Sequence, residues 1–200
     1  YLLLYAAFTT FSFYFIYLVI HQVKRSNDTV QETHYLQYID YQTKLSNNFA
    51  IQPHIENLIT KKIDFTMLLI DIKDFRLVNS LYGFPVGDAI IKQLGLLFCN
   101  NKKKNDVIIG RIGGEEFLVV LKNVAPAVAI VEANQFIQAI AQHSFVGPKN
   151  TEIRISVSVG LCSYPTNGED MHTLTKKLIL AQQHAKANSI SSYFHASNLK

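Results

Sequence analysis

Two apolar runs joined by a short polar stretch constrain the fold of this chain more than any other feature. The stretch Gly113-Gly114-Glu115-Glu116-Phe117 lies between the apolar runs 107–109 and 118–121. Apolar runs on either side of a Gly-Gly pair are typical of two strands and a hairpin turn, in which glycine supplies the positive φ that a primed two-residue turn needs. The sequence therefore predicts a hairpin over residues 106–123.

Acidic side chains gather beside this predicted turn. Glu115 and Glu116 begin the returning strand, where twist lets both carboxylates reach one ion. Such a pair is costly unless a cation lies between the two groups. A third carboxylate, Asp71, directly follows the apolar run 65–70. A Gly-Gly turn followed by two glutamates is also common on protein surfaces, so this motif alone leaves open a hairpin without chemistry.

Further motifs in a fixed order make the sequence resemble the GGDEF domain family, the diguanylate cyclases, with the signature present in the variant GGEEF. The resemblance runs from Asp40 to about Lys186. The matching stretches follow the family's order: Asp40-Tyr-Gln-Thr43-Lys-Leu45-Ser-Asn47, similar to D-x-L-T-G-L-x-N-R; Leu69-Ile-Asp71-Ile72; Phe75-Arg76-x-x-Asn79-x-x-x-Gly83-x-x-x-Gly87-Asp88; Arg111-Ile-Gly-Gly-Glu-Glu-Phe117; and Ile155-Ser-Val-Ser158-Val-Gly160.

Periodicity predicts an α+β domain, with an antiparallel sheet and helices on one face, and the resemblance implies the same palm-like or ferredoxin-like arrangement. Strands are expected over 65–72, 151–161 and, at an edge, 192–196. Residues 79–87 are expected to form a turn. Helices are expected from their apolar positions, which are Phe49, Ile55, Leu58 and Ile59 after a cap at Ser46 or Asn47; Ile90, Ile91, Leu94, Leu97 and Phe98; Ala133, Phe136, Ile137 and Ile140 within 125–144; and Met171, Leu174, Leu178, Ala181 and Ala185.

Residues 1–20 contain no charged side chain and would span roughly 30 Å as a helix, about the thickness of a bilayer core. Lys24 and Arg25 follow, which places the C-terminal side in the cytoplasm. The sequence thus predicts a transmembrane helix over 1–21, a linker or signalling helix over 22–42, and a GGDEF domain over 43–200 at the inner membrane. A secretory signal or a buried helix is the alternative.

Composition argues against a nucleic-acid-binding protein, a disulfide-stabilised protein and a zinc protein. The net charge of +4 has its densest run at Lys102–Lys104, which is typical of a solvated loop and lacks the interleaved aromatics that stack nucleic acid bases. Cys99 and Cys162 are too few and too isolated for a disulfide framework or a zinc site. We expect no nucleic acid partner.

The resemblance implies a complete active site. Asp71, Glu115, Glu116 and the carbonyl of Ile72 would hold Mg²⁺ or Mn²⁺, with Glu115 and Glu116 as catalytic residues. Substrate-binding residues would be Asn79 and Asp88 on guanine, and Arg76, Lys186, Gly113 and Gly114 on phosphate. Two GTP, one in each domain of a homodimer, would be joined into cyclic di-GMP with loss of pyrophosphate. Arg111 matches a further family position, with a solvated strand residue as the alternative.

Departures from the pattern support rival interpretations. Lys73 replaces the second aspartate of the family's D-x-D and, on a strand, would share a face with Asp71. A degenerate GGDEF domain that binds GTP or a protein without turnover is therefore the main alternative, and another metal-dependent nucleotidyl transferase is a third. The family's inhibitory product site, R-x-x-D, is replaced by Lys103-Lys-Asn-Asp106, so we expect no product inhibition there.

Overall fold

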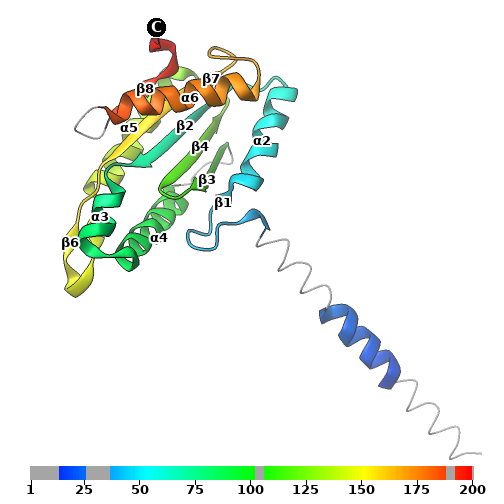
Figure 1. Ribbon diagram of the computed structural model, residues 1–200. Coiled ribbons are helices and arrows are strands. Elements are labelled where there is room, and N and C mark those ends of the chain that lie inside the picture. The colour runs from blue at the N-terminus through cyan, green and yellow to red at the C-terminus, as the bar shows by residue number, and fades with distance from the viewer. Residues whose placement is uncertain (1–13, 26–36, 102–105, 188–191, 200) are drawn as a thin grey trace, which may run out of the picture. The chain divides into compact units, whose positions relative to one another are not determined.

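The computed structural model describes residues 14–25, 37–101, 106–187 and 192–199, and the chain divides into two compact units over 1–38 and 39–200 (Figure 1). In the first unit, residues 14–25 are helical with exposed side chains. Residues 1–13 of the predicted transmembrane helix lie outside the described residues. Among the residues that are described, no helix is long and apolar enough to cross a membrane.

The second unit is built on a six-stranded sheet with the order β1-β3-β4-β2-β7-β8. Its strands are β1 (Ser46–Asn47), β2 (Phe65–Ile72), β3 (Val107–Gly113), β4 (Glu116–Lys122), β7 (Val157–Tyr164) and β8 (Ser192–His195). The four central strands are antiparallel, whereas β1 pairs with β3 and β8 pairs with β7 in parallel. The prediction of an antiparallel sheet was therefore wrong at both edges. β8 is parallel to β7 because helix α6 carries the chain back between them.

Helices cover both faces of the sheet, so the prediction of helices on one face was wrong (Figure 1). The helices are α2 (Asn48–Thr60), α3 (Phe75–Tyr82), α4 (Phe84–Asn101), α5 (Pro126–Gln142) and α6 (Met171–Lys186). One core cluster joins α4 and α5 to the sheet, and the other joins α2 and α6 to its opposite face. The short turns η1 (Pro148–Asn150) and η2 (Ala196–Asn198) complete the unit.

The central strands β2 and β7 are buried along their whole length. In β2, Leu68 and Ile70 belong to one core cluster while Met67 and Leu69 belong to the other. Two covered faces remove the apolar-polar alternation of a half-buried strand. The single alternating strand predicted over 151–161 is instead two strands, the short β6 (Glu152–Ile153) and β7. β6 pairs with β5 (Phe145–Val146) in a separate sheet.

Several local predictions are confirmed and others are not. Asn47 caps α2, accepting a hydrogen bond from the backbone N–H of Ala50 at 3.1 Å. Ile51, Ile55 and Leu58 form the buried face of α2, whereas Phe49 is 72% exposed, contrary to expectation. The turn predicted over 79–87 is instead the junction of α3 and α4 at Gly83, whose φ of 85° suits glycine. Residues 40–42, at the end of the linker helix predicted over 22–42, lie in a loop, and residues 26–36 of that prediction lie outside the described residues.

Candidate active site

The hairpin of β3 and β4 is present, but its turn differs from the predicted one. Gly114 and Glu115 form the turn, Gly113 pairs with Glu116, and a bulge lies between Arg111 and Gly113. Neither glycine has a φ in the left-handed region, so the primed turn was a wrong prediction. A β-bulge increases the local twist of the two strands. This added twist allows the strands to be joined by a turn that is not of the primed type. An added Cβ on Gly114 would meet nothing within 4 Å, so this glycine leaves open space at the tip of the turn.

Asp71 and Glu116 lie directly opposite each other where β2 and β4 pair. Asp71 is only 4% exposed. Like charges opposite each other in a sheet are unfavourable. Burial, followed by the negative charges of Asp71 and Glu115, raises the pKa of Glu116 above its usual value. The register therefore places two of the three predicted acids, Asp71 and Glu116, opposite each other beside the turn.

Lys186 at the end of α6 provides the compensating positive charge. Its Nζ lies 2.8 Å from Oδ1 of Asp71. This hydrogen bond is the main cause that raises the pKa of Lys186, and burial opposes it. Lys186 was predicted on the substrate phosphates, and in this structure it contacts the predicted metal ligand instead.

The donor set suits a hard divalent cation, since carboxylates and a backbone carbonyl are oxygen ligands of the kind that Mg²⁺ prefers. However, within residues 14–25, 37–101, 106–187 and 192–199, no three His, Cys, Asp or Glu side chains are grouped so that they could hold a metal ion. The residues that would hold such a cation, Asp71, Glu115, Glu116 and the carbonyl of Ile72, are thus not gathered around one point in this structure, and Lys186 contacts Asp71.

Lys73 follows the end of β2 and is 7% exposed. Its backbone N–H donates to the carbonyl of Ser156 at 2.9 Å. Burial lowers the pKa of Lys73; Asp74 opposes this shift, and the charge of Lys186 adds to it. The strand ends at Ile72, so strand alternation does not govern the direction of Lys73, contrary to the premise of the prediction. Lys73 is thus a largely buried cation that experiences the charge of Lys186, the residue that contacts Asp71.

A hollow of about 440 Å³ opens beside Glu115, lined by Phe75, Arg76, Asn79, Ser80, Phe84 and Glu115. Oδ1 of Asn79 is buried and, in the described part of the chain, has no hydrogen-bond partner. A buried polar atom without a hydrogen-bond partner destabilises the fold. If the Asn79 side chain turned toward the hollow, a bound ligand could supply the missing hydrogen bond. Asn79, predicted on guanine, and Arg76, predicted on phosphate, thus line one hollow.

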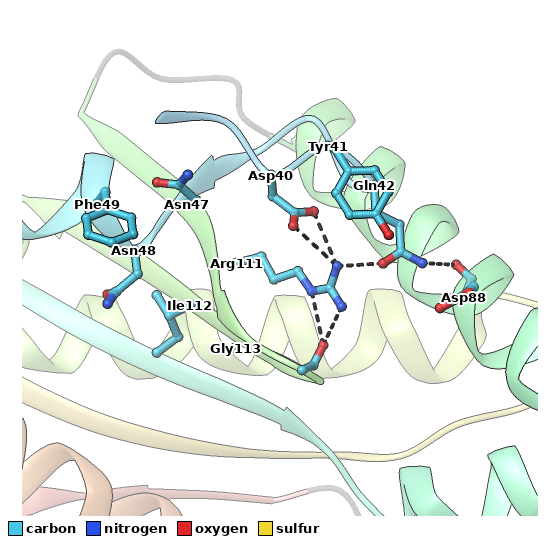
Figure 2. Close-up of a pocket in the computed structure, with 11 residues that line it drawn as sticks. Asp40, Tyr41, Gln42, Asn47, Asn48, Phe49, Asp88, Arg111, Ile112 and Gly113 are labelled. Atoms are coloured by element: carbon cyan, nitrogen blue, oxygen red, sulfur yellow. Dashed lines mark hydrogen bonds and ion pairs between the residues drawn. The ribbon is translucent and has the colours of Figure 1, made fainter. Parts of the chain in front are cut away.

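A second hollow of about 510 Å³ lies on the other side of the turn, and Figure 2 shows the side chains around it. Asp88, Arg111, Gly113 and Gly114 are among the residues that line it. Asp88 is exposed. The two predicted guanine-binding residues, Asn79 and Asp88, therefore line different hollows that flank the same hairpin turn.

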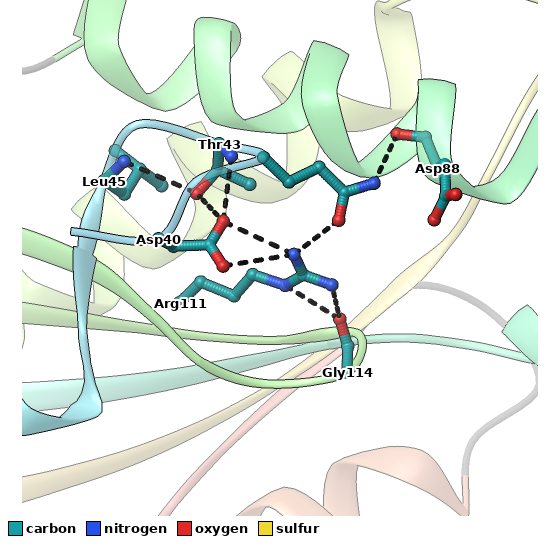
Figure 3. A network of polar contacts seen from close by, with 7 residues as sticks. Asp40, Thr43, Leu45, Asp88, Arg111 and Gly114 are labelled. Atoms are coloured by element: carbon teal, nitrogen blue, oxygen red, sulfur yellow. Dashed lines mark hydrogen bonds and ion pairs between the residues drawn. The ribbon is translucent and has the colours of Figure 1, made fainter. Parts of the chain in front are cut away.

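Arg111 connects the turn to the start of the domain (Figure 3). Its Nε and Nη2 both donate to the carbonyl of Gly114, at 3.0 and 2.8 Å. Its Nη1 faces Asp40, 3.3 Å from Oδ1, and donates to Oε1 of Gln42 at 2.6 Å. The interpretation of Arg111 as a solvated strand residue was wrong.

Asp40 also organises its own loop. Its Oδ1 accepts from the backbone N–H of Thr43 at 2.8 Å and from the Thr43 hydroxyl at 2.7 Å. Burial raises the pKa of Asp40, but the hydrogen bonds from Thr43 and the charge of Arg111 outweigh burial and lower it overall. Asp40 and Gln42 were missed as site residues, although Asp40 opens the motif that ends in Asn47.

The fold and the acidic hairpin turn between two hollows are consistent with the comparison with known protein families. A family model described as diguanylate cyclase, GGDEF domain matches residues 37–191, and the chain belongs to that family.

Two curated relatives illustrate the match. The chain is 30% identical over 158 residues to the bifunctional diguanylate cyclase/cyclic di-GMP phosphodiesterase MucR of Pseudomonas aeruginosa, covering 77% of this chain and 23% of MucR. It is 35% identical over 127 residues to an uncharacterized membrane protein of Staphylococcus aureus, covering 61% of this chain and 35% of that protein. The chain thus spans between 23% and 35% of the length of these relatives.

Solved structures share the fold at lower identity. The coiled coil and GGDEF domain of DgcB from Caulobacter crescentus, in complex with c-di-GMP, aligns with a TM-score of 0.78 at 16% identity, over 87% of this chain and 93% of that one. The GGDEF domain of YfiN (TpbB) from Pseudomonas aeruginosa aligns with a TM-score of 0.73 at 21% identity, over 79% and 99% of the two chains. At these identities the likeness establishes the fold alone.

Proposed function

We propose that this chain is a membrane-anchored diguanylate cyclase that condenses two GTP into cyclic di-GMP and pyrophosphate. The observation that carries the proposal is the pairing of Asp71 with Glu116 beside the open turn at Gly114. This pairing concentrates negative charge where a divalent cation and a triphosphate could meet.

Each site residue has a role in the proposal. Asp71, Glu115, Glu116 and the carbonyl of Ile72 would hold Mg²⁺ or Mn²⁺, which when bound would offset the charge of the substrate phosphates. Gly114 leaves room for the phosphates at the tip of the turn, and Gly113, which lies beside Glu116, would bind them through its backbone N–H. Arg76 and Lys186 would bind phosphate oxygens, with Lys186 leaving Asp71 to do so. Asn79 and Asp88 would bind the guanine edge, whose N1 and N2 donors suit a carboxylate acceptor.

The reaction joins two substrates. The 3′-hydroxyl of one GTP attacks the α-phosphate of the other, and pyrophosphate leaves; the same step, repeated in the opposite sense, closes the ring. Each domain holds one GTP, so two domains must face each other and the active form is a homodimer. The uncharged residues 1–20 would anchor the chain in the inner membrane, with the catalytic domain in the cytoplasm.

The test is GTP turnover by the purified 200-residue chain in detergent with Mg²⁺, with the product identified by mass. We expect cyclic di-GMP from the wild-type chain and none from Glu116→Gln. Glu56→Gln, on the exposed face of α2, is a control that should keep full activity. GTP binding without product in the wild-type chain would contradict the enzyme.

A second candidate function is a GGDEF domain that binds GTP or a protein partner without turnover. Two observations favour it: Lys186 contacts Asp71, and the buried Lys73 stands where the family pattern has an aspartate. If the wild-type chain binds GTP without turnover, Lys73→Asp is the variant to examine. Restored turnover in that variant would identify Lys73 as the residue that silences the site.

A further inference from the structure

The side chain of Gln42 joins two parts of the proposed nucleotide site. Its Oε1 accepts a hydrogen bond from Nη1 of Arg111 at 2.6 Å, and its Nε2 donates to the backbone carbonyl of Asp88 at 3.1 Å. Figure 2 shows Gln42 between the Arg111 guanidinium and Asp88. Through Arg111 the same amide is linked to the Gly114 carbonyl of the turn.

The chemistry of the two neighbours allows only one orientation of this amide. A guanidinium has donors and no acceptor, and a backbone carbonyl has an acceptor and no donor. The amide oxygen must therefore face Arg111 and the amide nitrogen must face Asp88. Glutamine is suited to this place because it carries both groups; glutamate lacks the donor, and leucine, which the family pattern D-x-L-T has at this position, lacks both. The bridge is therefore a feature of this chain and not of the family pattern.

Gln42 also makes the shortest contact of the Arg111 guanidinium. The two oxygens of Asp40 lie 3.3 and 3.4 Å from Nη1 of Arg111, compared with 2.6 Å for Oε1 of Gln42. Asp40 directs its shorter hydrogen bonds to Thr43. The position of the guanidinium along the turn thus depends on Gln42 as well as on the charge of Asp40.

We propose that Gln42 is a positioning residue that fixes the spacing between the hairpin turn and the first turns of α4, and so the placement of Asp88 on the guanine edge. The role of Asp88 in this inference rests on the proposed function. The hydrogen bonds of Gln42 to Arg111 and to the Asp88 carbonyl do not depend on it. It predicts that Gln42 contributes to guanine selectivity without touching the reacting atoms.

Two variants of the 200-residue chain separate the two contacts. Gln42→Glu keeps an acceptor for Arg111 and places a carboxylate oxygen against the Asp88 carbonyl, whereas Gln42→Leu removes both hydrogen bonds. Gln93→Leu is the matched control. Gln93 also bridges two backbone groups, donating to Ala89 at 3.2 Å and accepting from Val146 at 3.1 Å, but these groups belong to α4 and β5 rather than to the hairpin.

The first measurement is the affinity of each protein for GTP and for ITP, which lacks the guanine 2-amino group. Loss of the proposed hydrogen bond between Asp88 and the guanine 2-amino group, worth about 1 kcal/mol, corresponds to about fivefold in affinity. We expect both Gln42 variants to lower the preference for GTP over ITP about fivefold, and Gln93→Leu to leave this preference unchanged. A general loss of stability would lower both affinities together. Equal preference in wild type and both Gln42 variants would overturn the proposal.

The second measurement is hydrogen exchange without nucleotide over residues 107–117. We expect faster exchange in Gln42→Leu than in wild type or Gln93→Leu, because Arg111 loses its shortest contact to a side chain. Unchanged exchange would overturn the link between Gln42 and the turn. If the wild-type chain binds no GTP, the proposed function fails, and exchange still decides whether Gln42 positions the turn.

Discussion

The ionisation of Glu116 should affect the stability of the domain. Burial and the charges of Asp71 and Glu115 raise its pKa, so the folded state favours the protonated carboxyl more than the unfolded state does. A group whose pKa is raised by folding stabilises the fold below its unfolded pKa of about 4.5, and this contribution is lost as pH rises through the folded pKa.

We therefore predict that Glu116→Gln stabilises the chain at pH 8 without divalent metal and has a smaller effect near pH 4. The measurement is the midpoint of thermal unfolding in EDTA across this range. Glu56→Gln, an exposed control on α2, should change the midpoint equally at both pH values. A stabilisation by Glu116→Gln that is larger at low pH would contradict the argument.

Gly87 allows a close approach of α4 to Asn79. A Cβ at position 87 would collide with Oδ1 of Asn79 and lie 3.1 Å from Phe75. Overpacking costs roughly 1–3 kcal/mol, against about 1 kcal/mol of helix propensity that alanine gains over glycine. We predict that Gly87→Ala loses up to about 2 kcal/mol of stability and weakens GTP binding, because Asn79 must move.

Denaturant unfolding and GTP binding would test this prediction. Gly114→Ala is the contrasting variant, because a Cβ there meets no atom within 4 Å. Its stability should stay within about 0.5 kcal/mol of wild type. Equal stability of the two alanine variants would show that Asn79 tolerates the added methyl group.

At the scale of elements, the residue pattern within each segment predicted whether that segment forms a helix or a strand. The strand β2 has its predicted limits, and α5 and α6 bury their predicted apolar positions, apart from the partly buried Met171. One failure is a misread period. Phe49 was predicted as a core position of α2, but it stands two residues before Ile51 and therefore on another side of the helix from Ile51 and Ile55, which pack into the core.

The cap of α2 gives a prediction at this scale. Asn47→Ala removes the acceptor for the Ala50 N–H and should cost about 1 kcal/mol, which is a decrease of about 2–4 °C in the unfolding midpoint for a chain of this size. Asn48→Ala, at the first helical residue and exposed, is the control that should change little. A loss in Asn48→Ala as large as in Asn47→Ala would mean that the cap is not the stabilising feature.

At the scale of the whole molecule, the proposed chemistry needs two copies of the domain. Product formation at low enzyme concentration should therefore rise with the square of the concentration of the wild-type chain. The measurement is specific activity over a dilution series at saturating GTP. Addition of excess Glu116→Gln chain should lower the activity further by forming mixed dimers. A constant specific activity through dilution to well below any measured dimer constant would contradict the two-domain mechanism.

The sequence by itself determined the type and order of most elements, the hairpin and its acids, and a cap of α2 at Ser46 or Asn47, of which the structure selects Asn47. These depend on propensities and spacings within a few residues, which the sequence displays directly. The family motifs also identified Asp71, Arg76 and Asn79 as candidate site residues, and the structure places Arg76 and Asn79 in one hollow.

Only the tertiary structure decided which side chains meet. The contacts of Lys186 with Asp71, of Arg111 with Gln42 and of Gln42 with Asp88 span 115, 69 and 46 residues. Such pairs depend on strand register and on helix packing across the sheet, which no local pattern encodes. The covering of both sheet faces was decided in the same way, because it follows from where α2 and α6 pack rather than from the pattern of any one strand.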